Sequence, residues 1–373
     1  MKTKNLENIS NISQAEIIDN IQLIRSENIG PITYYKILEK FGTARNAIEN
    51  FNEVSKINNR HVKLCNRLNA EREFELTEKF GAKIILHSDP NYPKLLKEIS
   101  DAPPIISVKG DLELLNGEKI AVVGPRNASH NAISYAKKFA LLLGQSSIVS
   151  VSGMARGVDT AVHEASILSG TIAVLAGGIN NIYPHENTKL YHQIADCGLV
   201  LSEMSFGFEP KGSNFLQRNR LISGLSVATV IIEAGLQSGS LATAKHAMEQ
   251  NREVFAVPGS PFDPRCQGTN RLIKDGANII TEVEDILNST SKKNHLMKKA
   301  STISKIKKDY NFSNDEIGVA GEEILNKLNT EPTNIDFLIS QLQIPINLFN
   351  TAVMELELYN KVAVNYGKIM KLV

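Results

Sequence analysis

The chain has 373 residues, of which 42% are hydrophobic and 22% are charged, and this balance is ordinary for a globular protein. Its length allows two or three domains. The 41 basic and 40 acidic residues nearly cancel, which excludes a simple polycation. Binding to nucleic acid would therefore depend on local basic patches.

The sequence lacks the usual marks of export and metal binding. Cys65, Cys197 and Cys266 are far apart and form no CxxC pair, so neither a zinc site nor a disulfide framework is indicated. The first residues contain no apolar core of the signal-peptide type. No apolar run approaches the ~20 residues that span a bilayer. We therefore expect a cytoplasmic protein that does not enter a membrane.

Residues 1–80 predict a helical module of the helix-hairpin-helix or SAM-like kind. Apolar residues recur at helical spacing over 17–24, and a second helical stretch includes Tyr35. The turn Asn28-Ile29-Gly30-Pro31 lies between them. In a helix-hairpin-helix unit, backbone amides beside such a turn can approach a phosphate. A plain helical packing module explains the same turn equally well.

Residues 81–288 predict an α/β domain. The proline-rich stretch 82–114 is interpreted as a short strand followed by an extended connector packed on this domain. From Glu118 onward, short apolar runs alternate with helix-compatible stretches, which indicates a Rossmann-like, doubly wound, mainly parallel sheet. The expected strands are Ile120–Val123, Ile148–Val151, Thr171–Leu175, Leu199–Leu201, Val227–Ile232 and Val254–Val257, and the helices include Ala132–Leu143, Ser238–Gln250 and Gly268–Asp275.

Two further segments follow the sheet. Residues 289–315 predict a lysine-rich linker, whose like charges and few apolar residues indicate disorder. Residues 316–373 predict three short helices and a hairpin at Tyr366-Gly367, the pattern of a winged-helix domain. The third helix ends in the acidic and apolar run 355–359, where a helix that reads DNA needs Arg, Lys or Asn. We therefore interpret this domain as a protein-contact or regulatory module.

Nearly every predicted strand ends in glycine and small hydroxyl residues. Glycine lets backbone N–H groups approach an anion closely, and guanidinium forks suit phosphate oxygens. Turns use Gly and Ser in any case, but the carboxyl ends of parallel strands share one sheet edge, together with several arginines. We therefore expect a phosphate site formed by Gly124, Arg126, Ser129, Ser152, Gly153, Arg156, Gly177, Gly178, Arg218, Asn219, Arg220, Ser238, Gly239 and Ser240.

Coenzyme binding and catalysis are not indicated. No GxGxxG fingerprint follows the first strand, so we expect no cofactor. Asp159 and His163 lie four residues apart on an expected helix and could exchange protons. No activated nucleophile and no metal-binding motif accompanies them, so a capping Asp and a packed His are the favoured interpretation. The sequence therefore predicts neither catalytic residues nor metal ligands.

Motifs along residues 89–277 closely resemble those of the DNA-processing protein A (DprA/Smf) family in order and spacing. They are DPNYPKLL, DAPPIISVKGD, VVGPRNAS, SGMARGVDTAVHEA, GGINNIYPHEN, SEMSFG, FLQRNRLISGLS, EAGLQSGSLATA, and VPGS with GTNRLIKDGA. The resemblance implies a non-enzymatic protein that binds single-stranded DNA and dimerises through its Rossmann-like domain. It also implies that the protein loads RecA onto incoming DNA during natural transformation.

The resemblance also implies which residues hold DNA. Phe215 falls where an aromatic ring could stack on a base, as in sequence-tolerant single-strand binding. Pro125 departs from the family pattern and removes an N–H that could meet a phosphate, so contact there would depend more on Arg126. The resemblance implies that the family's phosphate pocket at the strand ends is formed here by Arg126, Ser152, Gly153, Arg156, Arg218, Asn219, Arg220, Ser238, Gly239, Ser240 and Thr243.

Two alternatives to a DNA-binding protein remain at this point. A nucleotide phosphoribohydrolase of a related fold would need a PGGxGTxxE signature ending in a catalytic Glu. In residues 239–246, no carboxylate stands three residues after a candidate Ser or Thr. A scaffold that recruits partners through its terminal domains would leave the pocket vestigial, and the retained strand-end arginines speak against it.

Overall fold

The computed structural model describes residues 12–54, 62–289, 314–328, 333–342, 344–359, 361–365 and 368–372. These residues fall into two compact units, within Met1–Leu296 and Met297–Val373. The predicted linker at 289–315 lies outside the described residues except at its two ends.

The first unit begins with the predicted helical module. Ser13 caps the first helix by accepting a hydrogen bond from the backbone of Glu16 at 3.2 Å. Pro31 opens the second helix, where a missing N–H costs nothing. Asn28, in the turn between them, adopts the left-handed conformation with φ 60°. The helices are α1 (Gln14–Ile24), α2 (Pro31–Phe41), α3 (Ala44–Glu49), α4 (Phe51–Val54) and α5 (Arg67–Lys79).

A nine-stranded sheet forms the centre of this unit, with the order β1-β2-β6-β5-β4-β3-β7-β8-β9. Strands β3 to β9 pair in parallel, and β1 and β2 add an antiparallel edge beside β6. The doubly wound, mainly parallel sheet predicted from sequence is confirmed. The strands are β1 (Lys83–Leu86), β2 (Ile105–Gly110), β3 (Lys119–Val123), β4 (Val149–Ser152), β5 (Thr171–Val174), β6 (Leu199–Ser202), β7 (Ala228–Ile231), β8 (Glu253–Ala256) and β9 (Asn278–Ile279).

The stretch 82–114 is more than the connector expected from its prolines. It supplies β2, which pairs with both β1 and β6 and so belongs fully to the sheet. Pro103 and Pro104 stand just before the strand, where a missing N–H removes no ladder hydrogen bond. The helix α6 (Lys94–Lys97) and the 3₁₀ turn η1 (Leu112–Leu115) complete this stretch.

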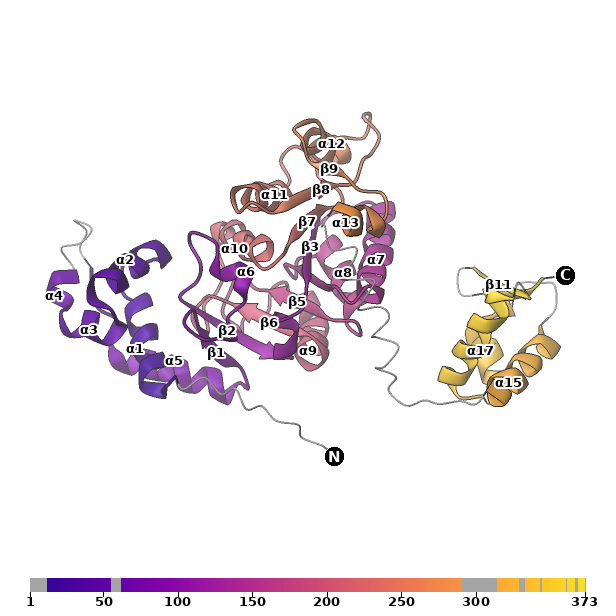
Figure 1. The fold of residues 1–373 in the computed structure, drawn as a ribbon, viewed down its shortest axis with the longest axis horizontal. Helices are drawn as coiled ribbons and strands as arrows, with labels where there is room; N and C mark the ends of the chain where they lie inside the picture. The colour runs from indigo at the N-terminus through magenta and orange to yellow at the C-terminus, as the bar shows by residue number, and fades with distance from the viewer. Residues whose placement is uncertain are drawn as a thin grey trace. The chain divides into compact units, whose positions relative to one another are not determined.

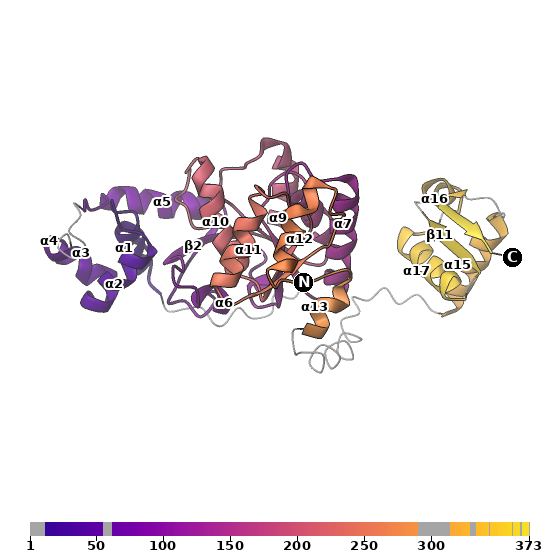
Figure 2. The same ribbon diagram turned by 90° about the horizontal axis from the view of Figure 1, so that it is seen from above.

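Helices cover both faces of the sheet (Figures 1 and 2). One face carries α7 (His130–Gln145), α8 (Val158–Ser166), α9 (Thr188–Cys197) and α13 (Val283–Ser289). The other carries α6, α10 (Gly212–Gly224), α11 (Ser240–Glu249) and α12 (Gln267–Lys274). Because β3 lies between β4 and β7, the chain reverses its direction of winding there, and this is where such sheets place ligands.

The second unit is a small α/β assembly with its own core, which includes Ile324, Phe349 and Ile369. Its three strands pair antiparallel in the order β10-β12-β11. This order of elements is compatible with the winged-helix prediction, which stays a prediction, and the turn at residues 366–367 lies outside the described part. The elements are α15 (Asn314–Lys327), β10 (Thr333–Asn334), α16 (Ile335–Leu342), α17 (Ile346–Leu358), β11 (Val362–Asn365) and β12 (Lys368–Lys371).

Candidate nucleic-acid interface

A cavity of about 480 Å³ lies at the carboxyl edge of the sheet, where the winding reverses. One wall is the loop after β3, a second is the loop after β7 with the start of α11, and a third is α10. It therefore unites three of the segments predicted from sequence. The predicted residues that line it are Gly124, Arg126, Phe215, Arg218, Asn219, Ser238, Gly239, Ser240 and Thr243.

A second cavity of about 260 Å³ adjoins the first and shares Arg126 and Phe215 with it. Gly153 and Arg156 line this smaller cavity, together with Tyr183. The rings of Phe215 and Tyr183 contact each other with centroids 5.1 Å apart and planes tilted by 56°. The carbon at the centre of the Arg126 guanidinium lies 5.2 Å from the centre of the Phe215 ring. Phe215 and Arg126 therefore border both cavities and Tyr183 borders the smaller one, which suits bases and backbone of a single strand.

The two arginines on the strand-end loops are open to solvent. Arg126 is exposed, so its charge can reach a ligand at either cavity. Arg156 is also exposed and forms an ion pair with Glu186, whose side chain is 60% exposed. Such an exposed pair contributes little to stability. Arg156 can therefore release Glu186 and bind another anion, such as a phosphate.

Arg218 lines the larger cavity but is anchored to the protein. It is 4% exposed, and its Nη1 donates hydrogen bonds to the backbone carbonyls of Gly153, at 2.6 Å, and of Val174. Burial lowers the pKa of Arg218 to about 10, and the charge of Asp159 opposes that shift. The guanidinium thus stays charged at neutral pH. It ties α10 to the ends of β4 and β5 and places a fixed positive charge at the cavity wall.

Arg220 has a different position from the one expected. It lines neither cavity. Its side chain is 5% exposed and forms ion pairs with Glu203 and with Asp101, the latter at 3.1 Å. Its charge is therefore used inside the protein, where α10 meets the end of β6.

The wall at the start of α11 is rich in hydroxyl groups. The Oγ atoms of Ser238 and Ser240 lie 2.7 Å apart, and Thr243 is almost completely buried at the cavity wall. The Asn219 amide donates to the carbonyl of Gly239 at 3.3 Å, which connects α10 to this wall. A Cβ on Gly239 would meet no atom within 4 Å, so this turn is open to a ligand.

Four of the predicted residues support the loops and line neither cavity. Ser152 is buried and donates to the carbonyl of Val122 at 2.7 Å, and Ser129 caps α7. Gly177 and Gly178 lie close to the loop after β6, where a Cβ on Gly178 would come within 2.4 Å of the Ser205 carbonyl oxygen. These positions need glycine because of packing.

Tyr183 was not among the residues predicted for the site. It is 45% exposed and borders the smaller cavity. One feature of the sequence could have identified Tyr183. It is an aromatic residue that follows the third predicted strand, in a segment that also contains the predicted site residues Gly177 and Gly178. Its contact with Phe215 depends on the fold and could not be inferred from spacing.

Asp159 and His163 are held by separate contacts inside the protein. His163 is fully buried, and its Nδ1 lies 2.7 Å from the hydroxyl of Thr171. Asp159 accepts hydrogen bonds from the backbone of Gly153 and Ala155 at 3.1 and 3.3 Å, and burial raises its pKa. Both side chains are thus engaged within the protein, and Asp159 also lines the larger cavity; the absence of a catalytic role stays a prediction.

His163 gives the protein a measurable sensitivity to acid. Burial lowers its pKa to about 3, whereas an unfolded histidine titrates near ~6.5. Below that pH the unfolded chain binds a proton that the folded protein does not, so the free energy of unfolding falls as the pH falls. Between pH 7.5 and pH 5 we expect this residue to remove about 2 kcal/mol. Urea unfolding of wild type and His163→Gln at both pH values measures it, since the variant should lack this part of the slope. Equal slopes in the two proteins would contradict the assignment.

Among the residues that the structure describes, no cluster of three or more His, Cys, Asp or Glu side chains could hold a metal ion. Within the same residues, no helix is long and apolar enough to cross a bilayer.

Two family models match this chain. The model described as DNA recombination-mediator protein A matches residues 83–291, which contain the sheet and both cavities. The model described as the DprA-like N-terminal HHH domain matches residues 14–75, so the first helices are identified as a helix-hairpin-helix domain.

Individual proteins and solved structures also match this chain. The chain is 42% identical over 212 residues to DNA processing protein DprA of Streptococcus pneumoniae, covering 56% of this chain and 74% of that protein. It is 34% identical over 284 residues to protein Smf of Escherichia coli, covering 75% of each. The X-ray structure of the S. pneumoniae protein superimposes with a TM-score of 0.62 at 31% identity, covering 75% of this chain and 99% of that one. A Helicobacter pylori DprA structure, reported for its single-stranded DNA binding mode, gives 0.52 at 31% identity, covering 57% and 96%.

Proposed function

Because this chain belongs to the DprA/Smf family of DNA-processing proteins, we propose that it binds single-stranded DNA at the carboxyl edge of its sheet and does not alter the DNA chemically. The observation that carries the proposal is the arrangement of Arg126, Phe215 and Tyr183 around two adjoining cavities. Stacking on aromatic rings tolerates any base, and cations follow the phosphates. The related H. pylori protein is described as binding single-stranded DNA.

Individual roles follow from the positions of the side chains. Arg126 and Arg156 meet backbone phosphates, since both are exposed beside the cavities. The Ser238–Thr243 wall hydrogen-bonds a phosphate or sugar, and Arg218 supplies a fixed charge behind it. Phe215 and Tyr183 stack on bases. Arg220 is left out of the DNA contacts because its charge is already paired.

The wider role is that of a recombination mediator. The protein protects incoming single strands and loads RecA onto them in the cytoplasm during natural transformation, and it acts as a homodimer without a cofactor. The description of the matching family as a recombination mediator supports this role. Non-enzymatic action is supported by the position of His163, which is fully buried, contacts Thr171 and lines neither cavity.

The proposal is tested by removing one exposed cation at the cavities. Arg126→Ala should weaken binding to single-stranded DNA and make it less sensitive to salt, because one fewer phosphate contact releases fewer counterions. The slope of log affinity against log salt should fall by about 0.7. Fluorescence anisotropy over a salt series measures both effects, with an equally long duplex as competitor and light scattering to report the oligomeric state.

The control is Arg45→Ala, since Arg45 is exposed on α3, forms an ion pair with its helix neighbour Glu49 and lines neither cavity. It should leave affinity and slope unchanged. Recovery of the strand after long incubation should return DNA of unaltered length and base content. Wild-type protein that does not bind single strands, or Arg126→Ala protein with unchanged slope, would refute the proposed site.

A further inference from the structure

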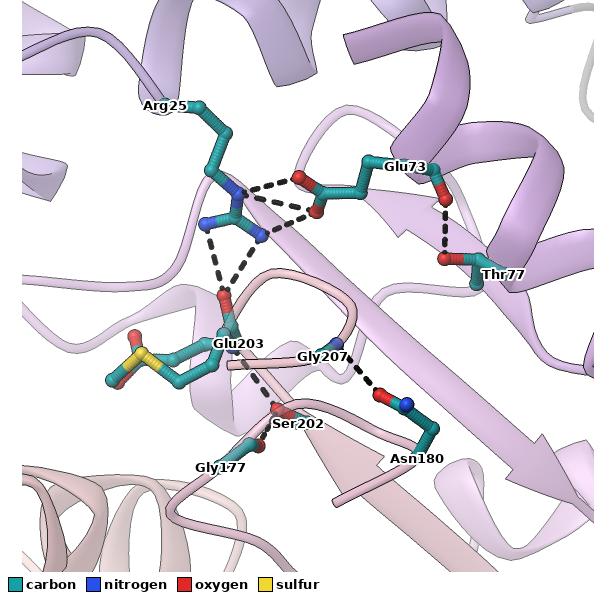
Figure 3. A network of polar contacts seen from close by, with 9 residues as sticks. Arg25, Glu73, Thr77, Gly177, Asn180, Ser202, Glu203 and Gly207 are labelled. Carbon is teal, nitrogen blue, oxygen red and sulfur yellow. Dashed lines mark hydrogen bonds and ion pairs between the residues drawn. The ribbon is translucent and has the colours of Figure 1, made fainter. Parts of the chain in front are cut away.

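A single arginine of the helix-hairpin-helix module holds the loop that follows β6. Arg25 is the C-cap residue of α1, and its Nε donates to both carboxylate oxygens of Glu73 at 3.1 Å. On the other side of the same guanidinium, Nη1 and Nη2 both donate to the backbone carbonyl of Glu203 at 3.2 Å (Figure 3). Arg25 and Glu73 are only 19% and 10% exposed, so this contact is well shielded from water. Arg25 therefore fixes the module to the end of β6, in addition to the apolar packing of Ile18 and Ile21 on the edge strands β1 and β2.

The loop held by Arg25 leads directly into the helix that carries the DNA-facing ring. Residues 203–211, here called the β6–α10 loop, connect β6 with α10. Phe215 lies in the first turn of α10. The carboxylate of Glu203 also pairs with Arg220, further along α10. Glu203 thus binds Arg25 through its backbone and α10 through its side chain.

The same loop is tied to the segment that carries the second ring. The hydroxyl of Ser202 donates to the Gly177 carbonyl at 2.6 Å, and the Gly207 amide donates to Oδ1 of Asn180 at 2.7 Å (Figure 3). The Gly178 amide donates to the Phe208 carbonyl at 2.9 Å. The segment 177–181 then leads to Tyr183. The anchored loop is consequently linked to both members of the aromatic pair.

We infer that the helix-hairpin-helix module positions the single-strand site through Arg25, which fixes the β6–α10 loop and with it Phe215 and Tyr183. This inference rests on the proposed function, because it assigns Arg25 a role in the affinity of that same site. Arg25 is a positioning residue and does not touch DNA. Its charge is neutralised by Glu73, so its effect passes through hydrogen bonds and the two loops. A contiguous network of this kind can change binding when a member far from the ligand is altered.

The experiment replaces Arg25 with Met in the full chain, which keeps the length of the side chain and removes the guanidinium. Affinity for single-stranded DNA should fall about threefold to tenfold. The slope of log affinity against log salt should stay that of the wild type, because no phosphate contact is lost. Arg45→Met, the same substitution on an exposed residue of the same module, should leave both quantities unchanged.

A double-mutant cycle separates positioning from general destabilisation. If Arg25 acts through the aromatic pair, Arg25→Met should cause no further loss in a protein that already carries both Phe215→Ala and Tyr183→Ala. Glu73→Gln should weaken binding in the same direction as Arg25→Met, and circular dichroism at the assay temperature should report folded protein in every case. Unchanged affinity in folded Arg25→Met and Glu73→Gln proteins, a reduced salt slope, or an additive loss in the protein that lacks both rings would each overturn the inference. Failure of the proposed function is distinguishable, because the wild type would then not bind single strands at all.

Discussion

Arg220→Met is expected to lower the free energy of unfolding by about 3–5 kcal/mol, the usual cost of removing one partner from a buried ion pair. The substitution leaves Glu203 with no cation on its carboxylate, and that side chain is only 9% exposed. Burial already raises the pKa of Glu203, and Arg220 is the strongest influence that lowers it. Urea unfolding at neutral pH, monitored by circular dichroism, measures the loss.

Two matched variants test the origin of that loss. Arg271→Met removes an arginine of an exposed pair with Asp275 on α12 and should change stability by less than about 1 kcal/mol. Replacing Arg220 and Glu203 together by Met should recover most of the stability lost in Arg220→Met, because no buried charge is then left unpaired at that contact. An Arg220→Met protein as stable as Arg271→Met would show that the ion pair does not hold α10 in place.

The general fold can be predicted from the sequence because each strand is marked by a pattern of neighbouring residues. Each parallel strand is a short apolar run buried on both faces, so Thr171–Val174 and Ala228–Ile231 could be located to within a residue or two. The strand β2 was harder, because the prolines before Ile105 indicate irregular chain and hide the apolar run that follows them. The two-residue strand β9 is too short to produce a pattern.

The sequence predicts which loops form the site, but it identifies only some of the side chains that line the cavities. Arg218 and Arg220 are both predicted to hold the phosphate, yet both lie on α10, where residues two apart point in different directions. Arg218 therefore reaches the cavity wall, and Arg220 reaches Glu203. The contact between Tyr183 and Phe215 joins residues on separate segments, and sequence alone gives no measure of their distance.

Removal of the aromatic pair is expected to cause the largest loss of DNA binding that leaves the charge of the protein unchanged. Stacking of a base on an aromatic ring contributes about 1–3 kcal/mol. Phe215→Ala should therefore weaken binding to a single strand about tenfold to a hundredfold, and adding Tyr183→Ala should weaken it further. The salt slope should remain that of the wild type, in contrast to Arg126→Ala, because neither ring neutralises a phosphate. Tyr183→Phe retains the ring and should bind like the wild type.

The decisive comparison uses a strand of the same length without bases. Phe215 lies beneath the guanidinium of Arg126, so its removal could act either by losing a base or by displacing that cation. On an abasic strand, loss of stacking has no effect, and the Phe215→Ala and Tyr183→Ala proteins should bind as well as the wild type. An equal loss on both strands, accompanied by a lower salt slope, would mean that the rings support Arg126 and that the backbone alone is bound. A loss confined to the strand with bases assigns Phe215 and Tyr183 to base stacking and Arg126 to the phosphates.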